Sequence, residues 1–404
     1  MSGNSMQDWG LYFHIPFCEH RCNYCDFFTT ASSDKDKILK YLSYLTRECD
    51  LFTEKNKDEE ITIQSVYFGG GTPSYVPADA LTGILSKLRQ ECRFSDTIEI
   101  TVEIYPQSAL EETLDCYVES GVNRISLGVQ SLQPDELDSI ERIHSAHECF
   151  ESAEKTHEAK IVNLNVDLMF GLPGQTNKTW EESLYGILKM RPVHISLYSL
   201  MLERNTKMTQ MVEHGDISLP DDNSSTDMYM TAVTILNENN FEQYEVSSFA
   251  LSGYVSKHNS RYWSRKPYKG FGMSAHSYLH PVRSWNTCNY EHYFHTIDNG
   301  IFPVAGSEKL TMLQQANEAI MLGLRMNQGL DFECFRSRFG SRYSDLLSDK
   351  INGLLEDDPG SIYSIIHNKT LKLTTSGLLV SDSIISQLLF SENLKTQPQS
   401  DPAA

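Results

Sequence analysis

The sequence has no apolar run long enough to cross a membrane, and its opening residues, MSGNSMQDWG, lack the apolar segment of a secretory signal. It also has few basic residues: the formal net charge of −20 disfavours a nucleic-acid partner, because phosphate contacts need a basic face. We therefore expect a cytoplasmic globular protein, and its 404 residues allow two or three domains. A peripheral contact with a membrane is left open by this composition.

The sequence also gives no indication of a disulfide framework. The nine cysteines are an odd number in a long chain, whereas disulfide-rich secreted domains are short and pair their cysteines. This pattern indicates a reducing compartment. Most of the cysteines stand alone in the sequence, and we expect these to be small, buried and unreactive: Cys49, Cys92, Cys116, Cys149, Cys288 and Cys334.

Three further cysteines, Cys18, Cys22 and Cys25, lie close together in the stretch HIPFCEHRCNYCDFF. A structural zinc site would need a fourth ligand, and a CxxC redox pair would leave Cys18 without a role. Thiolates in one short loop suit an iron–sulfur cluster, and three of them leave one iron of a four-iron cubane open to an outside ligand. The CxxxCxxC spacing, with Tyr24 before the third cysteine, resembles the loop of the radical S-adenosylmethionine (SAM) superfamily, in which SAM takes that open iron.

The rest of the chain alternates between strand-like and helix-like segments. Charged and apolar residues at helical spacing predict helices over 34–52 and 134–158, the second with proline in its first turn. This alternation favours parallel pairing, so we expect an α/β fold, an incomplete (β/α)6 TIM-type barrel as in the radical SAM core. The predicted strands are residues 11–15, 65–69, 98–103, 124–129, 163–169 and 194–200.

Glycines and polar residues follow the carboxyl ends of these strands, where barrels of this type gather their chemistry. The glycine-rich stretch FGGGTPS (68–74) lets backbone approach a ligand closely, although a simple tight turn would also use it. Glu103 can accept hydrogen bonds from ribose hydroxyls, or it is a solvated strand end. Gln130 and Asp167 end two further strands, and Asp167, flanked by apolar residues, needs a partner such as Arg142.

Several sequence elements occur in an order that resembles the HemN/HemW branch of the radical SAM superfamily, over roughly residues 10–385. They are YFHIPFCEHRCNYCDF, VYFGGGTPSY, RISLGVQSLQPDEL, NVDLMFGLPGQT, QYEVSSFA, HNSRYW and GFGMSAHSY. That branch contains oxygen-independent coproporphyrinogen III oxidases and heme chaperones. By position, the resemblance implies SAM contacts at Tyr12, Tyr24, Gly70, Gly71, Thr72 and Glu103. In the oxidases a second SAM contacts the positions of Gln130, Arg142 and Asp167, and whether it binds here is open.

Two features resemble the heme-chaperone group of this branch more than the oxidases. The oxidases carry a further cysteine where this chain has Phe27, and they carry a long N-terminal arm, whereas only eleven residues precede Tyr12. The HNSRYW element (258–263) also matches the HNxxYW motif of the chaperone group. Two departures stand beside these matches. Ser256 replaces a common cysteine, which argues against covalent heme attachment there, and EIYPQS (103–108) differs from the usual E-A-N-P-G.

The match of the HNSRYW element to the chaperone motif implies that its histidine, His258, is a heme ligand. Histidine is the usual proximal ligand of heme iron, and Tyr262 and Trp263 can pack against a porphyrin. A structural role for His258 in a loop is an equal alternative. His276 is a second candidate ligand, for which burial in a glycine-rich turn is at least as good an interpretation.

Beyond residue 205 the pattern changes. A polar loop is predicted over 209–229, leading into a helix over 222–239, and strands and turns over 242–298. A helix over 308–326 then begins a C-terminal α+β domain that is similar to a winged helix, for which the acidic balance favours a cap on the barrel over DNA binding. The expected divisions are an N-terminal segment 1–10, the barrel 11–205, its extension 206–305, the C-terminal domain 306–390 and a disordered tail 391–404.

The resemblance implies a heme chaperone that binds heme and transfers it to an acceptor protein, with a [4Fe-4S] cluster held by three cysteines and an exchangeable SAM. A radical SAM oxidase of the coproporphyrinogen III type or a methyltransferase acting on a tetrapyrrole is the alternative, and enzymatic activity is left open. If SAM is cleaved, an electron donor such as a flavodoxin or a ferredoxin would be a partner. A purely structural protein with a vestigial barrel is disfavoured by the intact cysteine triplet.

Overall fold

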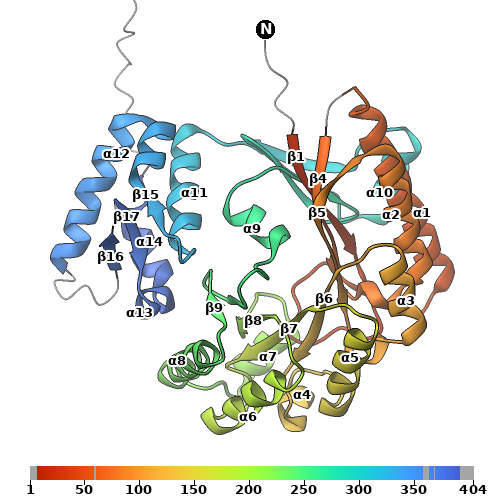
Figure 1. Cartoon of the computed structure of the whole chain (residues 1–404), viewed down its shortest axis with the longest axis horizontal. Coiled ribbons are helices and arrows are strands. Elements are labelled where there is room, and N and C mark those ends of the chain that lie inside the picture. The colour runs from red at the N-terminus through yellow and green to blue at the C-terminus, as the bar shows by residue number, and fades with distance from the viewer. Residues whose placement is uncertain (1–6, 59–60, 358–363, 368, 392–404) are drawn as a thin grey trace, which may run out of the picture. The chain divides into compact units, whose positions relative to one another are not determined.

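The structure, a computed structural model, divides into two compact units, Met1–Glu308 and Lys309–Ala404 (Figure 1). The expected polar tail lies outside the described residues apart from residue 391, and so do residues 1–6 of the expected N-terminal segment. The described residues are 7–58, 61–357, 364–367 and 369–391.

A single large sheet organises the larger unit. Its strands are β1 (Gln7–Ile15), β4 (Ile61–Gly70), β5 (Arg93–Ile104), β6 (Arg124–Gln130), β7 (Asn163–Phe170), β8 (His194–Ser199), β9 (Glu242–Gln243), β10 (Ser248–Ala250), β11 (Tyr268–Phe271), β12 (His276–Leu279), β13 (Val282–Asn286) and β14 (Val304–Lys309). They lie in the order β14-β13-β12-β11-β1-β4-β5-β6-β7-β8-β10-β9, so the sheet has two edges and does not close.

The parallel core of this sheet confirms the predicted fold class. Strands β1, β4, β5, β6, β7 and β8 pair in parallel and in chain order, and each overlaps one of the predicted strands. Strand β11 adds to β1 in parallel, and β10 and β12 then pair antiparallel at the two sides. The barrel is therefore incomplete, as expected.

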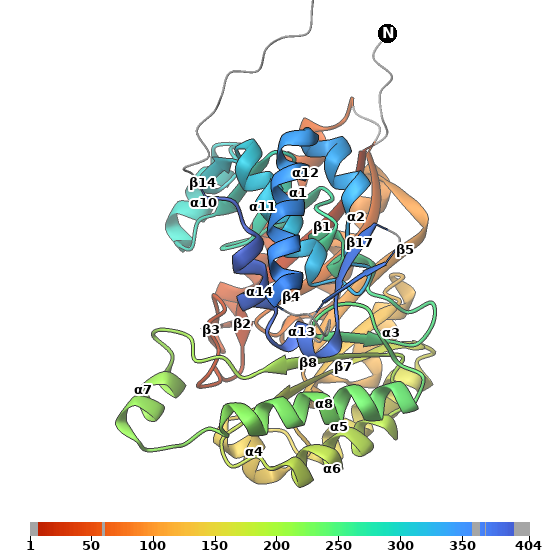
Figure 2. The same cartoon turned by 90° about the vertical axis from the view of Figure 1, so that its left-hand side faces the viewer.

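Helices cover the convex face of the sheet, and Figure 2 shows α5, α6 and α8 grouped on one side of β7 and β8. The helices of this unit are α1 (Lys35–Lys55), α2 (Ala78–Glu91), α3 (Glu111–Glu119), α4 (Pro134–Ser139), α5 (Ala146–Glu158), α6 (Asn177–Leu188), α7 (Lys207–His214), α8 (Asp222–Glu238), α9 (Lys257–Trp263) and α10 (Tyr290–Asp298). The short α9 is an exception, since it lies on the concave side (Figure 1).

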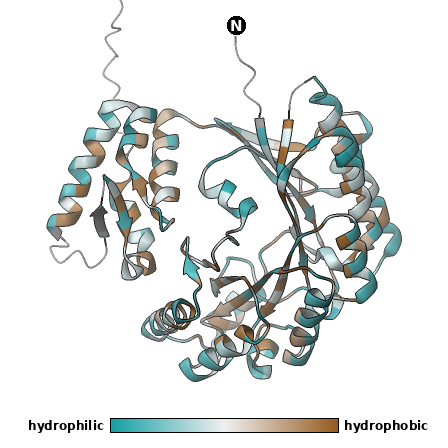
Figure 3. Ribbon diagram, viewed as in Figure 1, coloured by the Kyte–Doolittle hydropathy of each residue, from teal (hydrophilic) through white to brown (hydrophobic). Residues whose placement is uncertain are grey.

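Helix α1 shows why these segments form as they do. Asp34 caps it by accepting a hydrogen bond from the backbone N–H of Lys37, and Tyr41 and Leu45 lie on its fully buried face. Such helices carry hydrophilic and hydrophobic residues side by side (Figure 3).

The predicted helix over 134–158 is wrong as one element, because it is interrupted between α4 and α5. Glu141 has a left-handed backbone with φ of 55°, which an α-helix cannot contain. Ser145 then starts a new helix with a capping box, in which Ser145 and Glu148 each accept a hydrogen bond from the other's backbone N–H. Because of this interruption, Arg142 lies in the connection between the two helices and not on the surface of one long helix.

Two further expectations need correction in the region after residue 205. The predicted polar loop over 209–229 overlaps helix α7, which is capped by Thr206 and ended by Gly215 in the left-handed conformation. The HNSRYW element, expected among loops, strands and turns, forms helix α9. The helix predicted over 222–239 is present as α8.

The single cysteines are less uniform than expected. Cys49 and Cys149 are buried, Cys92 and Cys116 are partly buried, and Cys288 and Cys334 are exposed. Burial was therefore the wrong expectation for the last two: Cys288 lies in the connection between β13 and α10, and Cys334 lies in the first turn of α12 (Phe332–Asp357).

The smaller unit has the predicted α+β character. Helix α11 (Met312–Leu324) and α12 (Phe332–Asp357), which is kinked at Gly340, pack with α13 (Thr375–Leu379) and α14 (Ser381–Leu388). Strands β15 (Leu330–Asp331), β17 (Thr370–Leu373) and β16 (Ser364–His367) form an antiparallel sheet beside them. Among the helices that the structure describes in either unit, none combines the length and apolar content needed to cross a membrane.

One buried carboxylate ties the first helix to the end of the larger sheet. Glu48 of α1 is fully buried, and it accepts hydrogen bonds from the backbone N–H of Gly272 at 2.7 Å and the hydroxyl of Tyr293 at 2.9 Å. Its other oxygen accepts from Asn286 at 2.9 Å and lies 3.5 Å from the Lys269 ammonium. Glu48 therefore joins α1, β11, β13 and α10.

Replacing Glu48 with alanine should destabilise the larger unit by about 3–5 kcal/mol, because Lys269 would remain as a buried charge without its carboxylate. Urea unfolding followed by circular dichroism measures this loss. Glu54→Ala is the matched control on the same helix: its exposed pair with Lys57 should contribute less than about 1 kcal/mol. Equal effects of the two changes would contradict the assigned role of Glu48.

Candidate functional site

A cavity of about 580 Å³ opens at the carboxyl ends of the parallel strands in the larger unit. This volume lies within the range of small-molecule sites. Most of the residues expected from the sequence contribute to its wall: Cys18, Cys22, Tyr24, Cys25, Gly70, Gly71, Thr72, Glu103, Gln130, Arg142 and Asp167. Tyr12 and His258 do not line it.

The cysteine triplet forms one part of the wall, with all three thiols free. Burial raises the pKa of Cys18 to about 11 and raises that of Cys25, so these thiols resist losing a proton unless a cation compensates them. Across the described residues, no three histidine, cysteine or carboxylate side chains converge on a site for one ion. Thiolates that bind different irons of a cubane need not converge in that way, so the donor set fits a cluster better than a single zinc ion.

The cysteine loop is anchored to the broken helix between α4 and α5. The Asn23 amide donates to the carbonyl of Ser139 at 2.9 Å, and the backbone N–H of Met208 donates to the carbonyl of Asn23 at 2.9 Å. Arg142 donates to the Tyr24 hydroxyl at 3.3 Å. The interruption of the predicted helix therefore brings α7 and Arg142 against the cysteines.

The glycine-rich turn lies directly against the same loop. The backbone N–H of Gly71 donates to the carbonyl of Ile15, and that of Thr72 donates to the carbonyl of Phe17, each at 2.8 Å. A Cβ atom on Gly71 would lie 2.9 Å from the Cys18 sulfur. Close approach to the cysteine loop already requires glycine here, whatever ligand the turn also contacts.

Glu103 and Asp167 form the floor of the cavity. Glu103 accepts from the Tyr67 hydroxyl at 2.7 Å and from the backbone N–H of Gly70 at 3.1 Å, and burial raises its pKa to about 7. Burial also raises the pKa of Asp167, which accepts from Ser126 at 3.0 Å and from the neighbouring Asn165 at 2.8 Å.

The expected pairing of Asp167 with Arg142 is therefore wrong, because Asp167 bonds with Ser126 and Asn165 while Arg142 contacts Tyr24 and Tyr105. The Arg142 guanidinium lies 5.1 Å from the ring centre of Tyr105 and donates to Tyr24. Its Nε atom is buried and has no partner among the described residues. Gln130, nearby, has φ of 64° at a bulge between β6 and β7, a strained conformation often found at functional sites.

The sequence interpretation missed Tyr105. Its hydroxyl accepts from the backbone N–H groups of Ile143 and His144, at 3.0 and 3.2 Å, and so holds the interruption that carries Arg142. The signal was present in the EIYPQS departure, but a sequence pattern does not show what an unusual tyrosine contacts.

His14 was also missed, and it explains the position of Tyr12. The Tyr12 hydroxyl hydrogen-bonds with Nδ1 of His14 at 3.1 Å, and Nε2 of His14 hydrogen-bonds with the carbonyl of Phe28 at 2.8 Å. Tyr12 therefore acts behind the cavity wall, through the end of the cysteine loop. The HIPFC stretch contained this histidine, but its spacing from the cysteines did not reveal the contact.

His258 lies in the interior of the barrel, where it is 1% exposed. Nδ1 hydrogen-bonds with the Ser65 hydroxyl at 2.9 Å and Nε2 with the Tyr262 hydroxyl at 2.8 Å, so neither ring nitrogen is free for iron. The geometry gives no support to the expected heme ligation, which stays a prediction. His276 is exposed at the start of β12 with its ring near Trp285 of the neighbouring β13, not buried in a turn as the alternative had it.

Comparisons with known proteins agree with this geometry. The family model "Radical SAM superfamily" matches residues 12–184, and "HemN C-terminal domain" matches residues 310–380. The chain is 33% identical to the heme chaperone HemW of Bacillus subtilis, over 94% of this chain and 98% of the relative. It is 32% identical to the mitochondrial radical S-adenosyl methionine domain-containing protein 1 of Danio rerio, over 94% and 86%.

Among solved structures, coproporphyrinogen III oxidase (HemN) from Escherichia coli superposes with a TM-score of 0.82 at 20% identity, covering 96% of this chain and 91% of that one. At this identity the match shows a shared fold, with the barrel and the C-terminal domain together.

Proposed function

Because the chain belongs to the HemW family of the radical SAM superfamily, we propose that it binds heme, passes it to an acceptor protein, and holds a [4Fe-4S] cluster and SAM in the cavity of its larger unit. The observation that carries the proposal is the gathering of the three cysteines, the glycine-rich turn and two carboxylates around one cavity. Free thiols at every cysteine suit a protein of the reducing cytoplasm.

In this proposal Cys18, Cys22 and Cys25 hold the cluster, which when bound can supply an electron to SAM. Gly70, Gly71 and Thr72 approach SAM with backbone and hydroxyl groups, and Tyr24 lies beside it. Glu103 accepts from the ribose hydroxyls with the carboxylate oxygens that Tyr67 and Gly70 orient. The same cavity is lined by Gln130, Arg142 and Asp167. Counting the SAM molecules bound per chain of the reconstituted protein tests whether these three residues bind a second SAM.

A coproporphyrinogen oxidase is the second candidate, favoured by the fold shared with HemN. Phe27 weighs against it, since this side chain is 68% exposed at the cavity wall where the oxidases have a cysteine. Under either candidate function, the protein needs an electron donor such as a flavodoxin or ferredoxin only if it cleaves SAM.

Each of the three changes Cys18→Ala, Cys22→Ala and Cys25→Ala should abolish stable cluster assembly, because no other thiol lines the cavity in the described residues. Anaerobically reconstituted parent protein should hold about four irons per chain. Cys288→Ala, at an exposed cysteine outside the cavity, is the matched control and should keep the parent iron content. A full cluster in Cys22→Ala would refute the assignment.

SAM binding should weaken as pH falls through the raised pKa of Glu103, about 7, because protonation removes the charge that faces cationic SAM. At pH 6 about one tenth of the carboxylate stays ionised, so the affinity should fall up to about tenfold from its value at pH 8. Equilibrium dialysis with labelled SAM measures this. Glu103→Gln should bind weakly at both pH values; an equally steep pH dependence in that variant would place the titrating group elsewhere.

Heme titration and an enzyme assay on one reconstituted sample separate the two candidate functions. The chaperone proposal predicts saturable heme binding and no multiple-turnover conversion of coproporphyrinogen III in the presence of SAM and a reductant. Sustained formation of protoporphyrinogen IX would make the protein an oxidase. Absence of saturable heme binding would overturn the chaperone proposal.

A further inference from the structure

We propose that His258 is a positioning residue for the cofactor cavity: from the barrel interior it fixes Tyr67 and Tyr12, and through them Glu103 and the cysteine loop. The proposal rests on the proposed use of the cavity for SAM and a cluster. It assigns His258 a role other than the heme ligation expected from its motif.

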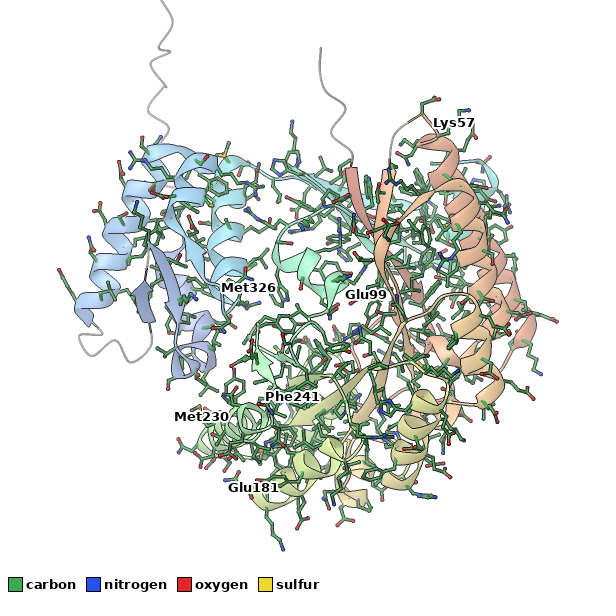
Figure 4. All side chains as sticks on the ribbon, in the orientation of Figure 1. Lys57, Glu99, Glu181, Met230, Phe241 and Met326 are labelled. Atoms are coloured by element: carbon green, nitrogen blue, oxygen red, sulfur yellow. The ribbon has the colours of Figure 1, made fainter. Side chains whose placement is uncertain are left out.

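The helix that carries His258 is held in place by a buried carboxylate. Glu99 of β5 is 4% exposed, and its two oxygens accept from the backbone N–H groups of Lys257 and His258, each at 2.9 Å. Figure 4 labels Glu99 on the strands beside α9. At the other end of the helix, Arg261 donates to the carbonyl of Pro267 at 2.9 Å and to that of Asp8.

The imidazole is fixed in orientation as well as in place. Its two nitrogens bond with Ser65 and Tyr262, and its ring stacks on Tyr67 with centres 5.1 Å apart and planes 30° apart. The ring centre of Tyr12 lies 6.4 Å away at a similar tilt. Burial lowers the pKa of His258 to about 3, so the ring is neutral and can use one nitrogen as donor and the other as acceptor.

Tyr67 transmits this position to the cavity floor. Its hydroxyl donates to one oxygen of Glu103 at 2.7 Å, and the other oxygen of Glu103 accepts from the backbone N–H of Gly70 at 3.1 Å. The Tyr67 hydrogen bond also lowers the pKa of Glu103 against the effect of burial. Movement of the Tyr67 ring would therefore change both the direction of the carboxylate and its charge.

Tyr12 transmits the same position to the cysteine loop. Its hydroxyl hydrogen-bonds with His14, which in turn hydrogen-bonds with the carbonyl of Phe28 beyond the last cluster cysteine. One buried ring thus supports the carboxylate side and the thiolate side of the cavity. A heme ligand in this position would lose one of its two hydrogen bonds and leave a buried hydroxyl unpaired, which is costly.

The test measures SAM affinity at several pH values, cluster iron and the heme Soret band in the reconstituted full chain. His258→Ala should weaken SAM binding about tenfold, the loss of roughly one oriented contact, and should move the pH midpoint of binding upward, as Tyr67→Phe also should. The two changes together should cost little more than either alone, because they act on one path. The Soret band of the heme complex should keep its parent form.

His258→Phe and Ser260→Ala complete the design. His258→Phe keeps a stacking ring but no iron ligand, so it should bind SAM better than His258→Ala and show the parent Soret band. Ser260→Ala, on the same helix with a hydroxyl that donates to the carbonyl of Ser256, should match the parent throughout. If His258→Ala does not fold, His258→Phe and Tyr67→Phe carry the comparison.

Parent SAM affinity and parent pH midpoint in His258→Ala would overturn the proposal. Loss of the parent Soret band in both His258→Ala and His258→Phe, with SAM binding intact, would overturn it in favour of heme ligation. Failure of the parent protein itself to bind SAM would instead refute the proposed function of the cavity, so the two failures are distinguishable.

Discussion

The polar interior of the barrel is the constraint on which the rest of the structure depends. Closed barrels of this type fill the space with branched apolar side chains, whereas the concave face here carries Ser65, Tyr67, Glu103, Ser126 and Asn165. A buried polar group costs free energy unless it is hydrogen-bonded. The open sheet leaves this face without strands to close over it, and α9 meets that need by packing on β4 and supplying partners.

Burial in the barrel interior also sets the charge of the cavity floor. Burial favours the neutral forms of Glu103 and Asp167, and the Asp167 carboxylate further raises the pKa of Glu103. Arg124, 1% exposed beneath them, opposes this effect on both, and its Nε and Nη1 atoms have no partner in the part of the chain that the structure describes. The floor therefore combines the buried Arg124 cation with two carboxylates whose pKa values are raised, that of Glu103 to about 7, which suits a ligand that brings its own hydroxyl groups.

The parallel strands could be predicted well from the sequence, because strand-like segments alternate with helix-like segments in a regular order. The prediction failed at the interruption between α4 and α5 because the helical spacing continues through it. Ile140 is fully buried and Ile143 follows at the right interval, yet Ile143 is 53% exposed and the chain turns at Glu141. Helix α9 has only seven residues, too few for spacing to reveal it.

The cysteine triplet and the strand-end residues were predictable because covalent spacing and strand direction place them at one rim. The hydrogen-bond partners of these residues could not be predicted, because a position at the end of a strand does not determine which neighbouring side chain a residue contacts. Asp167 and Arg142 line one cavity but bond to Ser126 and Tyr24. Tyr105, standing where the family pattern has a smaller residue, contacts Arg142 from just beyond the end of β5. The cavity wall thus has residues that the sequence pattern predicts, and tyrosines and histidines behind it that the pattern does not. These include Tyr67, which bonds with Glu103, and His14, which bonds with Tyr12.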